Sequence, residues 1–336
     1  MPTVTTVDTP LTRLRIPPWL AQALVVAGGG GAAAQAMING ELGTRLESSL
    51  WASAVSNTVG GSLFVIALLA SPSVRRGLTA LRGTVLPWWM FTGGVFGAIF
   101  VFAGATAVPL IGVALFTIAQ VCGNTVGALG TDALGLGPSG RLRVTRNRTI
   151  GAVLAIVAVG IANTGRGGDL TLWWLVPVVA LIGVGIALQG AFNGRVNDVT
   201  GNPLSTGLIN FVIGTGVLYA IVAVVTLISG TPTGTWPSEP WLYLGGPCGA
   251  ALVVVSMIAV KAIGVLRMAL GVLAGQLAGA VVFDLLRTGE PARPAVLLAV
   301  ALTAVAVAIA GRSGRTAVVT APDEAVISND ERPESP

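Results

Sequence analysis

Several amide side chains lie inside the apolar segments of this 336-residue chain. Gln35 and Asn39 are four residues apart and therefore share one face of a helix, and Gln189 and Asn193 repeat this spacing. An amide donates and accepts hydrogen bonds without carrying a charge. Amides that converge would line a polar, uncharged cavity, whereas isolated ones would only fix helix packing through hydrogen bonds. The candidates for a substrate pathway are Gln35, Asn39, Asn57, Asn124, Gln189, Asn193, Asn210 and Gln276.

Three charged residues at the ends of apolar runs are candidates for a gate or a counter-ion. Asp132 and Asp284 end two such runs and are expected either to cap or flank a helix, or to pair with basic residues as gates. Lys261 begins a tight turn near Gly264. Its ammonium group either reaches the cytoplasmic interface or serves as the counter-ion of an anionic substrate.

Enzymatic chemistry is not indicated by the residue types present. The chain has no histidine, and its two cysteines lie inside apolar runs. No arrangement of a nucleophile with a base, and no set of metal ligands, is evident. We therefore expect no enzyme activity, no metal and no cofactor.

The elements that position these side chains are long apolar segments. Hydrophobic residues make up 53% of the chain and charged residues 10%, against roughly 25% charged residues in soluble domains. The net charge of +5 resides in short arginine clusters between the apolar runs, which favours membrane loops over nucleic-acid binding. Ten runs approach the roughly 20 residues that a membrane span needs: 18–39, 50–70, 87–107, 110–131, 149–164, 172–193, 204–229, 241–260, 264–284 and 294–311.

Small residues recur every four positions in two of these runs. This spacing lets helix backbones approach closely in a membrane. It predicts a helix-packing role for Gly123, Gly127, Gly271, Gly275 and Gly279.

The second half of the chain repeats the first. Residues 93–132 align with 245–284 without a gap, and 14 of the 40 positions are identical. Just before this stretch, Gln35-x-x-x-Asn39-Gly40 aligns with Gln189-x-x-x-Asn193-Gly194. The order of features is the same in both halves, which indicates a duplication.

Five spans in each half require the second half to enter the membrane in the opposite orientation. With the N-terminus inside, the cytoplasmic segments hold 14 of the 19 Lys and Arg residues, as the positive-inside rule expects. We predict an all-α polytopic membrane protein of ten transmembrane helices in two inverted five-helix repeats, located in the plasma (inner) membrane with both termini cytoplasmic. The predicted divisions are a disordered tail 1–17, repeats 18–165 and 166–311, and a disordered acidic tail 312–336.

These motifs resemble the YdcZ-type proteins of the drug/metabolite transporter superfamily. The features that carry the resemblance are Gln-x-x-x-Asn-Gly in the first span of each half, Pro-Trp-Trp followed by Gly-Gly-x-x-Gly at 87–97, and Gly-Gln-x7-Asp at 275–284. The family contains single five-helix units and fused ten-helix chains, and this chain is similar to the fused kind. The resemblance implies export or exchange of small metabolites. Asn124 stands where the family pattern has Gln.

Three functions are compatible with this sequence. Inverted repeats favour a secondary transporter that moves a small metabolite by alternating access. The alternatives are a lipid-active flippase or scramblase-like protein, which would need a polar lateral opening, and a structural membrane subunit, whose amides would satisfy one another. The expected partners are a small-molecule substrate and the lipid bilayer, without nucleic acid, for a monomer or homodimer.

Overall fold

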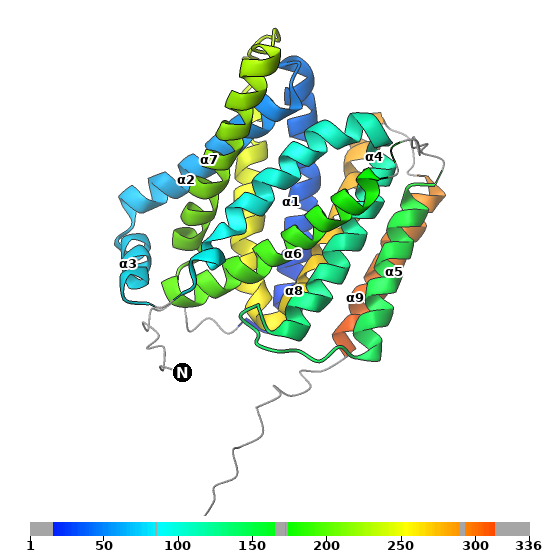
Figure 1. Cartoon of the computed structure of the whole chain (residues 1–336). Coiled ribbons are helices and arrows are strands. Elements are labelled where there is room, and N and C mark those ends of the chain that lie inside the picture. The colour runs from blue at the N-terminus through cyan, green and yellow to red at the C-terminus, as the bar shows by residue number, and fades with distance from the viewer. Residues whose placement is uncertain (1–15, 85, 165–171, 173, 289–292, 313–336) are drawn as a thin grey trace, which may run out of the picture.

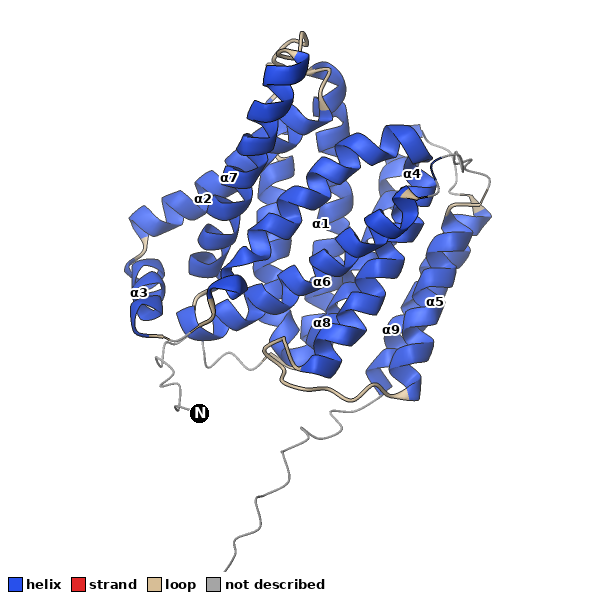
Figure 2. Cartoon of the chain, in the orientation of Figure 1, coloured by secondary structure: helices blue, strands red, loops and turns tan. Residues whose placement is uncertain are grey.

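The described part of this computed structural model is helical. It comprises residues 16–84, 86–164, 172, 174–288 and 293–312, and within these residues every regular element is a helix (Figure 2). The α-helices are α1 (Pro18–Arg45), α2 (Ser49–Ala70), α3 (Pro72–Ala80), α4 (Gly93–Leu134), α5 (Arg146–Ala162), α6 (Leu175–Thr200), α7 (Pro203–Ser229), α8 (Gly245–Thr288) and α9 (Pro294–Arg312). Short 3-10 turns at Trp88–Thr92 and Pro240–Tyr243 precede α4 and α8. The predicted tails 1–17 and 312–336 lie almost entirely outside the described residues.

The chain is a polytopic membrane protein by the length and composition of its helices. Six of the described helices are long and apolar enough to cross a membrane, and a shorter apolar segment spans Trp88–Gly104. Large apolar side chains such as Leu69, Leu227 and Leu286 are more than 70% exposed. Such side chains on the outside of a helix bundle fit contact with lipid rather than with water.

Two helices are too long for one crossing. The third and fourth apolar runs, expected as separate spans, form the single 42-residue helix α4, and the eighth and ninth form the 44-residue α8. A straight helix of this length would extend roughly 60 Å, about twice the hydrocarbon core of a bilayer. Instead α4 turns back near its label at one end of the bundle, and α8 turns back at the other end (Figure 1).

The turn in α8 has a defined backbone cause. Gly264 has φ 78° and ψ 168° and interrupts the helical conformation. A positive φ is costly for residues with a β-carbon and is readily adopted by glycine. The chain therefore ends one helix before Gly264 and begins another at Val265.

Helices of the two halves run in opposite directions in Figure 1. In the first half, α1 and α5 run upward and α2 runs downward. In the second half, α6 and α9 run downward and α7 runs upward. The closest packing is also between halves, because α1 lies against α8 and α4 lies against α6. The next most extensive contacts across the halves are those of α5 with α9 and of α2 with α7.

Glycines set the two closest helix crossings. A β-carbon at Gly275 of α8 would overlap the carbonyl oxygen of Val26 in α1, and one at Gly123 of α4 would overlap the carbonyl oxygen of Ala180 in α6. Gly127 and Gly279 lie one turn further along the same two crossings, against Val184 and Gly30. The small residues spaced four positions apart therefore lie where the backbones of neighbouring helices are in contact.

The short helix α3 was not expected from the sequence. It holds Arg75 and Arg76, which were assigned to a loop between the second and third apolar runs. Pro72 begins the helix, and the Arg75 guanidinium donates to the carbonyl oxygens of Leu68 (3.1 Å) and Leu69 (2.8 Å) at the end of α2. Nine residues are too few to show a membrane-spanning apolar run, so hydropathy alone could not find α3.

Candidate functional site

A hydrogen-bonded amide cluster joins α6 to α7. The Asn210 side-chain oxygen accepts hydrogen bonds from the Gln189 amide nitrogen (3.2 Å) and the Asn193 amide nitrogen (2.9 Å). Asn193 and Asn210 are 8% and 7% exposed. Gln189 and Asn193 face Asn210 together because their spacing places them on one side of α6.

The first residues of α4 pack directly against this cluster. A β-carbon at Gly93 would lie 2.5 Å from the Asn193 side-chain oxygen, and one at Gly97 would lie 3.1 Å from the Gln189 amide nitrogen. The amides of the second half therefore occupy space that two glycines of the first half leave open.

The same arrangement recurs with the halves exchanged. Gln35 and Asn39 of α1 lie over Gly249 and Gly245, the first residues of α8. The third member is Ser56 of α2, whose Oγ would lie 3.2 Å from a β-carbon at Gly245. At the offset of 154 residues, Gln35, Asn39 and Ser56 align with Gln189, Asn193 and Asn210.

The two clusters differ in how far their polar atoms are satisfied. Serine is too short to replace the amide of Asn210. As a result, the Asn39 side-chain oxygen and the Ser56 Oγ are both buried without a hydrogen-bond partner. Ser56 itself is 2% exposed. A buried polar group without a partner is costly, and it is rare unless water or a ligand supplies one.

The clusters remain separate within the described residues, where no hydrogen bond joins one to the other. They flank the contact of α2 with α7, in which the Phe211 ring packs beside Gly60 and the Asn57 amide nitrogen donates to Thr215 Oγ1 at 2.6 Å. Asn57 therefore holds α2 against α7 instead of joining either cluster.

The last two amide candidates lie at the helix crossings. Asn124 follows Gly123, is half-buried, and makes no side-chain hydrogen bond with the described residues. Gln276 follows Gly275 and is exposed. Neither side chain takes part in the bonded cluster of α6 and α7.

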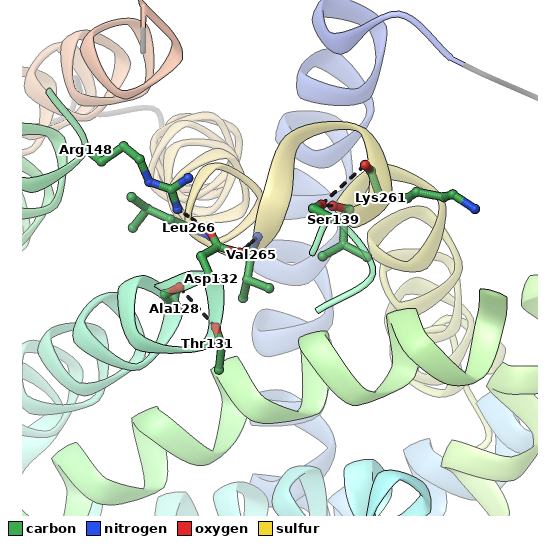
Figure 3. A network of polar contacts seen from close by, with 9 residues as sticks. Ala128, Thr131, Asp132, Ser139, Arg148, Lys261, Val265 and Leu266 are labelled. Carbon is green, nitrogen blue, oxygen red and sulfur yellow. Dashed lines mark hydrogen bonds and ion pairs between the residues drawn. The ribbon is translucent and has the colours of Figure 1, made fainter. Parts of the chain in front are cut away.

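Asp132 caps the helix that restarts after Gly264. Its carboxylate accepts hydrogen bonds from the backbone N–H groups of Val265 (2.9 Å) and Leu266 (3.0 Å), and it pairs with the Arg148 guanidinium of α5 (Figure 3). The side chain of Asp132 is 1% exposed and that of Arg148 is 8% exposed. A carboxylate at a helix N-terminus satisfies free N–H groups and interacts favourably with the helix dipole.

The loop between α4 and α5 also caps the helix that ends before Gly264. The Ser139 hydroxyl lies 2.7 Å from the carbonyl oxygen of Val260 and 3.3 Å from that of Lys261 (Figure 3). Arg195 of α6 in turn donates to the carbonyl oxygen of Gly135 at 2.8 Å. The segment from Asp132 to Ser139 therefore caps both helix ends at the break in α8.

Two charged candidates remain, Lys261 and Asp284. Lys261 is 60% exposed and pairs with Asp198 of α6, at 2.7 Å between Nζ and Oδ1. Its ammonium group is therefore at the molecular surface, with a carboxylate partner. Asp284 belongs to α8, but its side chain lies outside the described residues. Gly271, the other packing candidate, faces the side chains of Gln22 and Val25 in α1.

Sequence reasoning missed Ser56, Ser139, Arg148 and Asp198. Ser56 was detectable, because it aligns with Asn210 at the same offset that relates the other amides. Arg148 was counted only as a loop charge, since nothing in the local sequence connects it with Asp132. Among the described residues, no group of three or more Cys, Asp and Glu side chains is placed to hold a metal ion.

Comparison with known proteins found a family model and a solved structure that match this chain. A family model described as "Putative inner membrane exporter, YdcZ" matches the chain twice, over residues 20–161 and 173–311. A solved structure titled "Crystal structure of protein" is 19% identical, with a TM-score of 0.61 over 88% of this chain and 96% of that one. At that identity the likeness shows the fold alone. No curated protein matches. Because the family model covers most of the chain in two matches, the chain belongs to the YdcZ family of the drug/metabolite transporter superfamily.

Proposed function

We propose that this protein is a secondary transporter that exports or exchanges a small polar metabolite by alternating access. Its ten spans would form two inverted five-helix repeats, with both termini cytoplasmic. Three observations support this topology. The family model matches twice, equivalent helices run in opposite directions (Figure 1), and the crossings of α1 with α8 and of α6 with α4 use equivalent glycines.

The substrate proposed for this pathway is uncharged and bears hydroxyl or amide groups. Neither cluster contains a charged side chain, so recognition there depends on hydrogen bonds. The Asn39 side-chain oxygen is a free acceptor, and Ser56 Oγ both donates and accepts. A hydroxyl or amide group satisfies both atoms, whereas a charged group would lose its hydration without gaining a counter-ion.

The observation that carries this proposal is the contrast between two equivalent clusters. In one, Asn210 satisfies Gln189 and Asn193. In the other, Asn39 and Ser56 leave polar atoms unpaired. Amides that only fixed helix packing would be expected to pair in both halves. The unpaired atoms of the first half instead fit a binding site in which a ligand supplies the missing hydrogen-bond partners.

A flux screen in proteoliposomes tests the proposal. A mixture of labelled neutral metabolites is loaded, a gradient is imposed, and mass spectrometry identifies the solutes that leave faster than from protein-free vesicles. We expect a subset rich in hydroxyl or amide groups to leave through the wild type, and Asn39→Ala and Ser56→Ala to reduce that flux at least tenfold.

Ser53→Ala is the matched control. Ser53 is half-buried on α2, and its hydroxyl donates only to the carbonyl oxygen of Ser49. The Ser53→Ala variant should therefore transport solute at the wild-type rate. Folded wild-type protein that moves no solute would refute transport itself, while flux that is unaffected by Asn39→Ala and Ser56→Ala would refute the assigned pathway.

The lipid-active alternative has one specific observation in its favour. A groove with both polar and apolar walls lies between α1, α8 and α9. Lipid movement between leaflets would need a polar path across the whole bilayer. The test that separates the two functions is scrambling of a fluorescent phospholipid by the same proteoliposomes, for which we expect the protein-free rate.

A further inference from the structure

A groove of about 660 Å³ lies between α1 and α9, with α8 as its floor. Its lining combines basic and amide side chains at one end with small apolar side chains along its length. None of these residues belongs to the amide clusters or to the break at Gly264. The residues that decide its chemistry are Trp19, Gln22, Val26, Arg267, Val307 and Arg312.

The charge of this groove is uncompensated within the described residues. Neither Arg267 nor Arg312 pairs with a described carboxylate there, since the ion pairs found involve Arg45, Arg148 and Lys261. Arg267 is half-buried beside Gly311. An arginine held in apolar surroundings is expected to have an anionic partner.

The unsatisfied polar atoms of the groove also indicate a ligand. The Nε atom of Arg267 and the side-chain oxygen of Gln22 are buried without a partner. The Gln22 amide nitrogen donates to the backbone carbonyl oxygen of Arg267 at 3.4 Å, which holds the Gln22 side chain against α8. A phosphate group accepts several hydrogen bonds from guanidinium groups at once, so it suits Arg267 and Arg312.

The position of the groove along the helices indicates which kind of molecule carries the phosphate group. Trp19 is the second residue of α1 and Arg312 is the last residue of α9, so the basic end lies where both helices meet the membrane surface. Trp19 is 70% exposed, as is usual for tryptophan in the interfacial belt. From there Val26 and Val307 extend the lining away from these helix ends. A headgroup phosphate with an acyl chain fits both parts.

We propose that this groove binds an anionic phospholipid. The phosphate lies between Arg267 and Arg312, the Gln22 side-chain oxygen accepts from a headgroup hydroxyl, and an acyl chain follows Val26 and Val307. The site stands on residues different from those of the proposed transport pathway. Basic pockets between membrane helices are a known way to hold anionic headgroups.

Lipid binding is measured by native mass spectrometry of the delipidated full chain in detergent. The protein is titrated with phosphatidylglycerol and with phosphatidylcholine of the same acyl chains. We expect one tightly bound phosphatidylglycerol per wild-type chain. Arg312→Gln should weaken its binding about fivefold, which corresponds to the interaction of one arginine with an anionic surface. The double variant R267Q/R312Q should bind phosphatidylglycerol no better than phosphatidylcholine.

Two further variants keep the test decisive if Arg267→Gln fails to fold. Ala308→Trp fills the exposed groove wall without changing charge and should also abolish tight binding. Arg143→Gln removes another exposed arginine, which lies outside the groove, and should leave binding unchanged. Equal loss in Arg143→Gln, or wild-type binding in both Arg312→Gln and Ala308→Trp, would overturn the proposal.

A soluble phosphate is distinguished by competition. Inorganic phosphate and glycerol phosphate, each at millimolar concentration, should displace little phosphatidylglycerol because they lack the acyl chain. Full displacement by inorganic phosphate would assign the groove to a soluble anion and reject the lipid. Phosphatidylcholine binding equal to that of phosphatidylglycerol in the wild type would reject an anion-selective site.

Discussion

Asp132 illustrates how a single side chain acquires its role from residues far away in the sequence. As a charged residue at the end of an apolar run, it was predicted either to cap a helix or to act as a gate. Its carboxylate caps a helix, but the N–H groups it accepts from belong to Val265 and Leu266, more than 130 positions later. Local sequence shows that a carboxylate is present and cannot show which helix it caps.

Replacing Asp132 by Asn should destabilise the protein strongly. The change leaves Arg148 buried without a counter-ion and weakens the cap on the second part of α8. Breaking one partner of a buried pair costs roughly 3–5 kcal/mol. Thermal unfolding in detergent should show a clearly lower midpoint, and the double variant D132N/R148M should regain part of the loss.

Asp198→Asn is the control for this prediction. It removes the partner of Lys261 in an ion pair whose side chains are 60% and 26% exposed. Exposed pairs contribute about 0–1 kcal/mol, so the midpoint should change little. Equal destabilisation by the two substitutions would show that the position of Asp132 at the helix end does not matter.

Truncating one amide in each cluster should affect the stability of the protein differently. Asn210→Ala leaves the Gln189 and Asn193 nitrogen donors unpaired and should lower the free energy of unfolding by about 1–3 kcal/mol. Asn39→Ala removes an acceptor that has no partner, so stability should stay the same or rise. Unfolding curves of the two variants test this difference, and a larger loss for Asn39→Ala would mean that its oxygen is satisfied.

At the scale of helices, the glycine pattern was the most informative local signal. Small residues every fourth position predicted close packing, and Gly123, Gly127, Gly275 and Gly279 lie where backbones approach one another. The sequence could not show which helices meet. The glycines of α8 pack against α1 and those of α4 against α6, so each half packs most closely against the other.

Gly275→Ala should separate α1 from α8. The added β-carbon overlaps the backbone carbonyl oxygen of Val26, which cannot move without displacing α1. Overpacking of this kind costs roughly 1–3 kcal/mol. The melting temperature in detergent should fall accordingly.

Gly216→Ala provides the comparison on α7. No heavy atom lies within 4 Å of a β-carbon built there. An alanine in an open helical position is neutral or stabilises by about 0.4–1 kcal/mol. A fall in melting temperature as large as that of Gly275→Ala would mean that general flexibility, and not the crossing, explains both.

At the scale of the whole molecule, hydropathy predicted an all-helical polytopic membrane protein, and short motifs carried the resemblance to the YdcZ family. The described helices fit the first prediction, and the family match confirms the second. The long helices α4 and α8 differ from the predicted separate spans. The runs 87–107 and 110–131 were predicted as two spans, but one helix extends from Gly93 to Leu134. Only the positive φ at Gly264 interrupts the backbone conformation of α8.

The proposed orientation makes a labelling prediction. In a Cys122→Ser/Cys248→Ser background, Val144→Cys reports on the loop between α4 and α5, and Ser238→Cys reports on the segment between α7 and α8. Both positions are exposed. An impermeant maleimide added to intact cells should label Ser238→Cys and reach Val144→Cys only after lysis. The reverse pattern would place both termini outside.

Counterflow measures the central claim most directly. Proteoliposomes are loaded with an excess of the unlabelled solute found in the flux screen, and uptake of the same labelled solute from outside is followed over time. An alternating-access transporter must accumulate label transiently above equilibrium, because internal substrate speeds the return of the binding site. We predict this overshoot for the wild type and its loss in Asn39→Ala. Uptake by the wild type that rises only to equilibrium, at a rate independent of internal solute, would contradict transport by alternating access.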